Sequence, residues 1–323
     1  MRVLIYSVII LSSHKDSKMT VHHTLVCLLN DKNIGFKTCR LSSSPSIEKI
    51  REVYKHNIHT LVTILNFCRK NNIDSYRISS GLFPLLTHPN YHDKLFAIMN
   101  NEILPMVSKI NFSGIHLSCH PDQFILLSSL NENVIQNSSF ELNMWGYISH
   151  FIPIDLVNIH VGTKQKGIEY HTDIFMNAFQ KLDKHTQSLI SLENDEKSYC
   201  FLETLTLAKK AGCMMVPDFH HERCFQKRVN GELTNQECDK VIYDNIEEVF
   251  STYHTKALPT FHISSPKNGW VDSFKNNCSH ADYIDMNDYP KHLHSFNTEV
   301  RLDVEAKFKN DAIYRIVEEI KLL

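Results

Sequence analysis

Residues 188–218 contain two short apolar segments on either side of an amphipathic one, and this order decides the fold. The first segment, Ser188–Glu193, reads SLISLE, and the second, Met214–Asp218, reads MMVPD. Between them, Leu202–Ala211 (LETLTLAKKA) has apolar residues at helical spacing and is followed by Gly212, a residue suited to a helix C-cap. This pattern predicts a strand, a helix and a second strand, the repeating unit of a parallel sheet.

The same alternation extends over the whole chain. The other expected strands are Arg2–Ser7, Tyr76–Ser80, Gly114–His120, Asp155–His160, Pro259–Ser264 and Arg301–Glu305. The other expected helices are Ile47–Arg69, Tyr91–Ile110, Asn133–Phe151, Asp173–Lys184, Glu237–Tyr253 and Asp311–Leu323. Eight strands alternating with helices predict an α/β fold, a single (β/α)8 barrel domain over residues 1–323. An open doubly wound sheet is the alternative, but Ser7–Ser13 lacks the glycine-rich phosphate loop that usually follows its first strand.

Composition narrows the class of protein without naming a partner. The 34 Lys and Arg residues nearly balance the 36 Asp and Glu residues, so no overall basic charge indicates nucleic acid. Nine cysteines without a CxxC pair favour a reduced intracellular protein, with cytoplasm and nucleus indistinguishable. The start, MRVLIYSVIILSS, fits a first strand better than a signal peptide, because no clear cleavage site follows. No segment approaches the roughly 20 apolar residues of a membrane span, so we expect a soluble protein.

Six of the expected strands end in side chains that bind metal ions. These residues are His120, His160, Glu193, Asp218, His262 and Glu305. In a barrel, the carboxyl ends of the strands converge on one face, where active sites form. Imidazoles and carboxylates without thiolates suit Mn, Zn or Fe in a hydrolytic site. Glu193, central in this order, is placed to bridge two ions, and paired ions are the usual device for attack on a phosphodiester.

Two further segments add ligands near this face. Asp218-Phe-His-His221 places a carboxylate and two imidazoles at one strand-to-helix turn. We expect Cys224 to be structural, and His220 to be structural or to support a ligand without binding the ion. His280-Ala-Asp282 offers two ligands on one side of an extended segment, because alternate residues share a face.

An ordered set of motifs resembles the ultraviolet-damage endonucleases. The motifs are Tyr76-Arg-Ile-Ser-Ser80, Leu82-Phe-Pro84 with His88, Leu117-Ser-Cys-His-Pro-Asp-Gln-Phe124, Asn158-Ile-His-Val-Gly162, Leu192-Glu-Asn-Asp195, Val216-Pro-Asp-Phe-His-His221, Phe261-His-Ile-Ser-Ser-Pro266, His280-Ala-Asp-Tyr283 and Asp303-Val-Glu-Ala-Lys307. Each motif alone is unspecific, but together they occur in family order from Tyr76 onward.

The resemblance implies a TIM barrel with up to three divalent ions, commonly Mn²⁺, with Zn²⁺ or Mg²⁺ as alternatives. It implies hydrolysis of damaged double-stranded DNA 5′ to a cyclobutane dimer or 6-4 photoproduct, with Glu193 and Glu305 as catalytic residues, and no obligate protein partner. By this likeness, one ion binds His120, His160 and Glu193, and a second binds Glu193, Asp218, His262 and Glu305. A third binds His221 and His280 with Asp282.

The resemblance also implies DNA-binding residues. Gln123 and Phe124 match the pair that enters the duplex at the lesion, where a ring replaces lost base stacking. Arg77, Lys267 and Lys307 are candidates for phosphate contacts, with ordinary salt bridges as the alternative. Tyr6 matches a tyrosine of the first strand in the family.

Two departures from the family pattern concern the seventh strand and the first loop. Thr260 stands where family members often carry a lysine that can be carboxylated near the metals. Ile5-Tyr6 leads into Ser7-Val-Ile-Ile10, without the asparagine of the family's first loop. The alternative functions are an apurinic-site endonuclease or sugar isomerase of the same barrel, and a catalytically impaired damage-binding protein.

Overall fold

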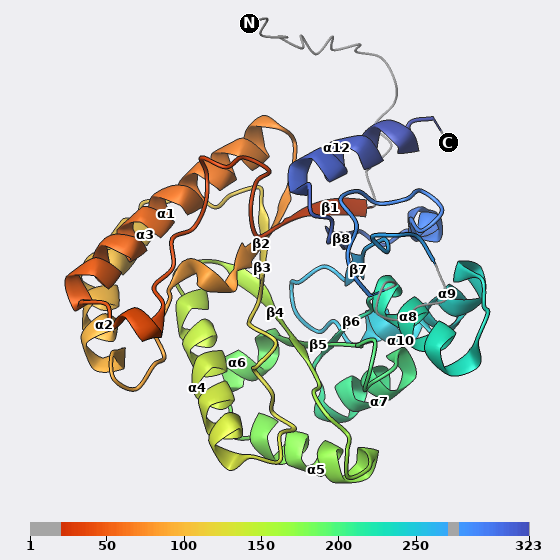
Figure 1. The fold of residues 1–323 in the computed structure, drawn as a ribbon, viewed down its shortest axis with the longest axis horizontal. Helices are drawn as coiled ribbons and strands as arrows, with labels where there is room; N and C mark the ends of the chain where they lie inside the picture. Colours follow the sequence, from red (N-terminus) through yellow and green to blue (C-terminus); the bar gives the residue numbers. More distant parts are fainter. Residues whose placement is uncertain (1–20, 271–277, 323) are drawn as a thin grey trace, which may run out of the picture.

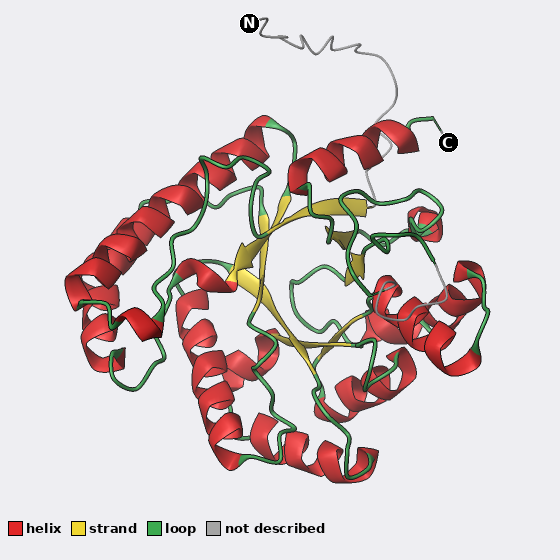
Figure 2. Cartoon of the chain, viewed as in Figure 1, coloured by secondary structure: helices red, strands yellow, loops and turns green. Residues whose placement is uncertain are grey.

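Eight parallel strands form the centre of the protein in the computed structural model, which describes residues 21–270 and 278–322 (Figures 1 and 2). The strands are β1 (Val21–Val26), β2 (Ser75–Ser79), β3 (His116–His120), β4 (Ile154–His160), β5 (Ile190–Glu193), β6 (Met214–Val216), β7 (Thr260–Ile263) and β8 (Val300–Val304). They are ordered β6-β5-β4-β3-β2-β1-β8-β7. The two end strands meet at one bridge, between Asp218 and His262, so that the sheet is a nearly closed barrel. The predicted TIM barrel is confirmed.

Helices cover the outside of this barrel (Figure 2). They are α1 (Ile47–Lys70), α2 (His92–Ile98), α3 (Leu104–Val107), α4 (Glu132–Ser149), α5 (Ile168–Phe179), α6 (Lys184–Leu189), α7 (Phe201–Ala211), α8 (Phe219–Asn230), α9 (Asn235–Asp244), α10 (Ile246–Ser251) and α12 (Lys309–Ile320). The 3-10 helices η1 (Leu41–Ser43), η2 (Ser80–Leu82) and η4 (Lys291–Ser295) and the π-helical segment η3 (Met99–Ile103) complete the helical elements. The main hydrophobic core fills the space between the strands and this outer layer.

The first strand lies elsewhere than the sequence predicts. Seven predicted strands overlap observed ones, but the barrel begins with β1, Val21–Val26. The predicted Arg2–Ser7 strand lies outside the described residues. β1 reads VHHTLV, and its two histidines interrupt the apolar pattern that a buried strand usually shows. Its pairing with β2 and β8 supplies the stabilisation that the local pattern does not indicate.

This correction also changes the reading of the first loop. The segment after the first strand begins at Cys27 and includes Asn30, whose amide donates to Asp311 Oδ2 at 2.7 Å. The departure inferred from Ser7–Ile10 therefore concerned the wrong segment. Tyr6 lies outside the described residues.

Polar side chains fill much of the barrel interior. Arg301, on β8, donates through Nη1 to Asp155 Oδ1 on β4 at 2.8 Å and so spans the barrel. Thr24 on β1 donates to Ser75 on β2 at 2.9 Å. A small apolar cluster of Leu156, Met214, Val216 and Ala257 lies apart from the main core. The barrel interior below the predicted metal ligands therefore also contains charged and polar side chains.

Candidate metal centre

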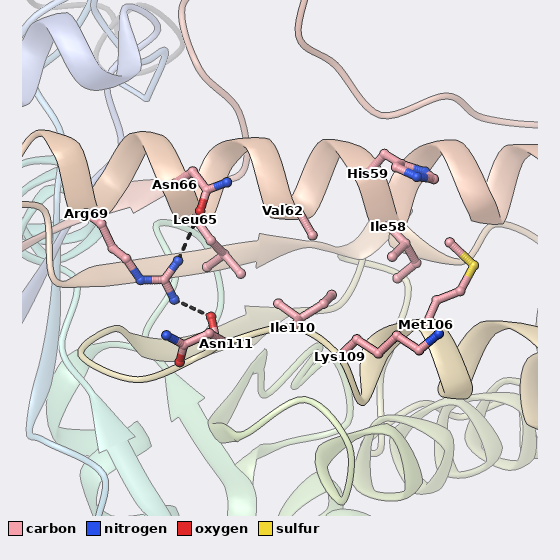
Figure 3. Close-up of a pocket in the computed structure, with 10 residues that line it drawn as sticks. All are labelled: Ile58, His59, Val62, Leu65, Asn66, Arg69, Met106, Lys109, Ile110 and Asn111. Carbon is pink, nitrogen blue, oxygen red and sulfur yellow. Dashed lines mark hydrogen bonds between the residues drawn. The ribbon is translucent and has the colours of Figure 1, made fainter.

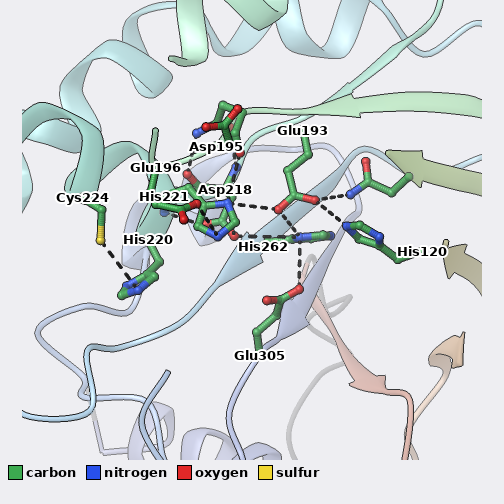
Figure 4. Close-up of polar contacts among 12 residues, drawn as sticks. His120, Glu193, Asp195, Glu196, Asp218, His220, His221, Cys224, His262 and Glu305 are labelled. Atoms are coloured by element: carbon green, nitrogen blue, oxygen red, sulfur yellow. Dashed lines mark hydrogen bonds and ion pairs between the residues drawn. The ribbon is translucent and has the colours of Figure 1, made fainter. Parts of the chain in front are cut away.

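The strand-end side chains lie together at the carboxyl end of the barrel (Figure 4). Among the residues that the structure describes, three groups have donor atoms within 4.8 Å of one another: His120, His160 and Glu193; Glu193, Asp218 and His221; and Asp218, His262 and Glu305. Because neighbouring groups share Glu193 or Asp218, they form one continuous cluster. The topology explains this gathering, since all eight strands are parallel and end on the same face.

Glu193 occupies the centre of the cluster. Its Oε2 lies 3.0 Å from His120 Nε2, and its Oε1 lies 3.1 Å from His262 Nδ1 and 3.3 Å from His221 Nδ1. Only 1% of its surface is exposed. A carboxylate with one oxygen directed to each side of a cluster can bridge two cations.

An amide holds this carboxylate in place. Asn158, on β4, donates through Nδ2 to Glu193 Oε2, and Ser191 donates to Asn158 Oδ1 at 2.9 Å. Burial alone would raise the pKa of Glu193, but the nearby His262 and the other imidazoles outweigh burial and hold it well below its ordinary value. Glu193 is therefore ionised across the physiological range.

Asp218 is oriented by the start of α8. Its Oδ1 accepts a hydrogen bond from the backbone N–H of His221 at 2.8 Å, as a helix N-cap does. Asn194 brackets the backbone of Asp218, accepting from its N–H at 2.8 Å and donating to its carbonyl at 3.0 Å. The other oxygen, Oδ2, is buried without a hydrogen-bond partner, and burial raises the pKa of Asp218. One oxygen thus fixes the side chain while the second faces the cluster.

Two histidines contribute from β3 and β4. His120 Nδ1 lies 2.8 Å from the Pro121 carbonyl oxygen, so that Nε2 is left to face Glu193. His160 Nδ1 is buried without a hydrogen-bond partner, and burial lowers the pKa of this imidazole. A neutral imidazole with a free lone pair is the form that binds metal ions.

His262 and Glu305 complete the cluster from β7 and the end of β8. His262 Nδ1 lies 3.4 Å from Glu305 Oε1 and 3.9 Å from Asp218 Oδ2, yet it has no hydrogen-bond partner. Glu305 Oε1 also accepts from Arg77 Nη1 at 2.6 Å. Burial would raise the pKa of Glu305, but the Arg77 and His262 charges hold it well below its ordinary value.

The donor set fits divalent metal ions. Three buried atoms, Asp218 Oδ2, His160 Nδ1 and His262 Nδ1, lack hydrogen-bond partners although buried polar atoms normally have them. All three belong to the candidate groups, which combine imidazole nitrogens with carboxylate oxygens. Bound cations would satisfy these atoms and offset the repulsion among the carboxylates.

The residues assigned to a third ion are less closely gathered. His280 Nδ1 lies 3.6 Å from Glu305 Oε2, and the rings of His280 and His221 are 6.4 Å apart. Asp282 is exposed, and its carbonyl accepts from the Phe308 N–H at 3.1 Å. The third ligand set therefore stays a prediction.

The loop after β3 presents the predicted lesion-binding pair to solvent. Phe124 exposes 73% of its surface, and Gln123 is also exposed. The neighbouring Asp122 accepts from Ser80, in the loop after β2, at 2.8 Å. Lys267 is exposed as well, in the segment after β7. An exposed ring is available to a ligand in a way that a packed ring is not.

Arg77, a candidate for a phosphate contact, lies inside the barrel. It is 7% exposed, and its guanidinium contacts Asp303 and Glu305. These two ion pairs explain its burial without a phosphate partner.

Sequence reasoning missed the polar residues that hold the ligands: Asn158, Asn194 and Asp303. Each lies within two residues of a predicted ligand, and alternate residues on a strand share a face. That spacing could have indicated Asn158, two residues before His160, and Asp303, two before Glu305.

Thr260 lies below the ligand cluster. It is fully buried, and its hydroxyl accepts from Arg301 Nε at 3.0 Å. The position where many family members carry a lysine is thus occupied here by a threonine bound to a buried arginine.

A separate hollow of about 320 Å³ lies between α1 and the segment around Ile110 (Figure 3). Its walls include aliphatic side chains such as Val62 and Leu65, and Arg69 contacts Asn111 at one end. None of the predicted ligands lines it, so it is distinct from the candidate metal centre.

A family model described as UV-endonuclease UvdE matches residues 21–323 of the chain. The chain belongs to the UvdE family. The match begins at the residue where β1 begins, and it confirms the family that the motifs indicate.

Individual relatives agree with this assignment. The UV DNA damage endonuclease of Bacillus pumilus (strain SAFR-032) is 28% identical over 291 residues, covering 88% of this chain and 86% of that protein. The protein of the same description from Bacillus cereus (strain G9842) is 29% identical over 296 residues, covering 88% and 87%. The crystal structure of SacUVDE has a TM-score of 0.74 and 25% identity, covering 94% of this chain and 100% of that chain.

A more distant structure shares the fold. Endonuclease IV from Thermus thermophilus has a TM-score of 0.52 at 10% identity, covering 92% of this chain and 99% of that chain. Among the described residues, we find no helix that has both the length and the apolar character needed to cross a bilayer.

Proposed function

We propose that this UvdE-family chain hydrolyses double-stranded DNA on the 5′ side of cyclobutane dimers and 6-4 photoproducts, leaving a 3′-hydroxyl. The observation that carries the proposal is the sharing of Glu193 and Asp218 among three groups of metal-ligand atoms at one end of the barrel. Family membership supports DNA-repair endonuclease activity.

Each ion has a proposed set of ligands. His120, His160 and Glu193 would hold one ion, and Glu193, Asp218, His262 and Glu305 a second. His221 and His280, with Asp282, would hold a third. We propose Mn²⁺, with Zn²⁺ or Mg²⁺ as alternatives. When bound, such ions supply a water of lowered pKa and a positive charge beside the phosphate.

The protein's own side chains would hold the cations and position the DNA substrate. Glu193 stays ionised because imidazoles surround it, so it can hold cations without first losing a proton. The exposed ring of Phe124 would stack at the lesion, and Gln123 would contact the unpaired base edges. Lys267 would approach a backbone phosphate.

The test uses purified protein, Mn²⁺ and labelled duplexes with a thymine dimer, an abasic site or no lesion. We expect cleavage 5′ to the dimer, and we expect Glu193→Gln to reduce it by about 100- to 1,000-fold, the loss that follows removal of one group that stabilises charge in the transition state. Glu248→Gln, at an exposed position on α10, is the matched control and should cleave normally.

The other outcomes identify the alternatives. Cleavage at the abasic site alone would favour an apurinic-site endonuclease built on the same barrel. Binding to the dimer without any product would favour a damage-binding protein. If the protein neither cleaves nor binds any of the three duplexes, the proposal is contradicted.

A further inference from the structure

Asp303 lies inside the barrel, beside His262 and two residues before Glu305. It pairs in register with His262 across β7 and β8, and only 1% of its surface is exposed. Its Oδ2 lies 3.3 Å from His262 Nε2, and its Oδ1 has no hydrogen-bond partner. A buried carboxylate therefore contacts the side of the His262 ring that faces away from the other ligands.

Arg77 links this carboxylate to Glu305. From β2, its Nη1 lies 2.6 Å from Glu305 Oε1 and 3.3 Å from Asp303 Oδ2. Nη1 is also 3.5 Å from His262 Nε2. Since Nη1 carries two hydrogens and two carboxylate oxygens lie nearer, we assign both hydrogens to Glu305 and Asp303.

This assignment fixes the hydrogen on the His262 ring. Because both hydrogens of Arg77 Nη1 are used by the carboxylates, no N–H is left to donate to His262 Nε2. His262 Nε2 therefore carries a hydrogen itself and donates it to Asp303 Oδ2. The form of an imidazole that binds a metal ion is neutral and has one N–H, so with that hydrogen on Nε2 the lone pair of Nδ1 is left for the ion. That lone pair faces Glu193 Oε1 at 3.1 Å and Glu305 Oε1 at 3.4 Å, the direction of the ligand cluster.

We propose that Asp303 and Arg77 are positioning residues for the metal centre. Asp303 holds the His262 ring with Nδ1 directed at an ion, and Arg77 holds both Asp303 and Glu305 while balancing their charge. The proposal rests on the metal-dependent function proposed above and deepens it. Removing the hydrogen-bond partner of a ligating histidine typically lowers metal affinity by roughly 10- to 100-fold.

The first test measures Mn²⁺ binding to the full chain by isothermal titration calorimetry, without DNA. We expect Asp303→Asn to weaken the affinity by about 10-fold or more. The matched control is Asp155→Asn, which changes another carboxylate of the barrel interior that is bound to Arg301 and outside the ligand groups. It should bind Mn²⁺ as the unmodified protein does. Equal affinities for Asp303→Asn and the unmodified protein would overturn the proposal.

A second measurement needs no folded variant of Asp303. Long-range ¹H–¹⁵N spectra of the Zn²⁺-loaded protein report which ring nitrogen carries hydrogen, and His262→Gln identifies the signal of this ring. We expect the hydrogen on Nε2, and a hydrogen on Nδ1 would overturn the proposal. Failure to bind Mn²⁺ or Zn²⁺ at all would also overturn it. Metal binding with the expected Asp303→Asn effect, but without DNA cleavage, would contradict the proposed function alone.

Discussion

Phe124 exposes most of its apolar side chain to water. Its replacement by alanine should leave the melting temperature unchanged, because little buried area is lost. We expect Phe124→Ala to weaken binding to a dimer-containing duplex by about tenfold, since base–aromatic stacking contributes roughly 1–3 kcal/mol. Fluorescence anisotropy with matched damaged and undamaged duplexes measures this change.

Phe140 provides the control for this substitution. It lies on α4 and exposes 39% of its surface. Phe140→Ala should leave the preference for damaged DNA unchanged. An equal loss of binding to damaged and undamaged duplexes in Phe124→Ala would show that the ring does not recognise the lesion.

At the scale of residues, the sequence predicts the candidate metal ligands better than the side chains that hydrogen-bond to those ligands. Glu193, Asp218 and His262 were predictable because charged residues at the ends of apolar strands stand out. Asn158 and Asn194 were not, because an amide has no distinctive pattern and acts here only through the carboxylates that it contacts. The burial of Arg77 was hidden for a similar reason, since its partners come from a strand more than 200 residues further along the chain.

At the scale of elements, α4 and α6 meet at a glycine. A Cβ added to Gly146 would lie 2.1 Å from Thr186 Oγ1 and 3.1 Å from Thr186 Cβ. Although alanine favours a helix over glycine by about 1 kcal/mol, this clash should dominate. We expect Gly146→Ala to destabilise the protein by about 1–3 kcal/mol, measured by urea unfolding.

A second substitution tests this cause. Adding Thr186→Ala removes the hydroxyl that the new methyl group meets, so the double variant should recover part of the loss. Gly35→Ala, where a Cβ would meet nothing within 4 Å, should unfold like the parent protein. No recovery in the double variant would indicate that the clash is not with Thr186.

The elements that the sequence misplaced have physical explanations. The predicted helix Glu237–Tyr253 is two helices, α9 and α10, divided at Asn245, whose backbone leaves the helical conformation. The predicted helix Tyr91–Ile110 is one uninterrupted helical segment, His92–Val107, whose middle part η3 has the wider π-helical turn. A helix was expected after Asp218 but its range was not predicted, because the first turn of α8 reads as a group of metal ligands rather than as an amphipathic pattern.

At the scale of the whole molecule, the metal centre couples stability to pH. Burial would lower the pKa of His262, but Glu193 and Asp303 raise it well above its ordinary value, and Asp218 does the same for His221. In the metal-free protein, this stabilisation is complete below about pH 6.5 and is lost as the pH rises through the folded pKa values. The lowered pKa of Glu193 has the opposite pH dependence: it stabilises the folded protein at neutral pH, and this stabilisation is lost as the pH falls below about 4.5.

Two trends of opposite sign follow. Between pH 7 and 9, we expect the melting temperature of the EDTA-treated protein to fall, while its Mn²⁺ affinity rises by about tenfold per pH unit for each proton displaced. Thermal unfolding and calorimetric titration over this range measure the two trends. In His262→Gln both slopes should be smaller. A melting temperature that rises with pH in the metal-free protein would contradict the assignment.

The pairing between the two ends of the sheet has a mechanical consequence. Strands β6 and β7 meet at the bridge between Asp218 and His262, and His262 N–H donates to the Pro217 carbonyl at 2.9 Å. An ion held by both side chains would cross-link the seam, as a disulfide joins two distant segments. Chelation should therefore speed amide deuterium uptake in β7 by more than in β3, which has a paired strand on either side. The cation would then hold the two ends of the sheet together in addition to its part in catalysis.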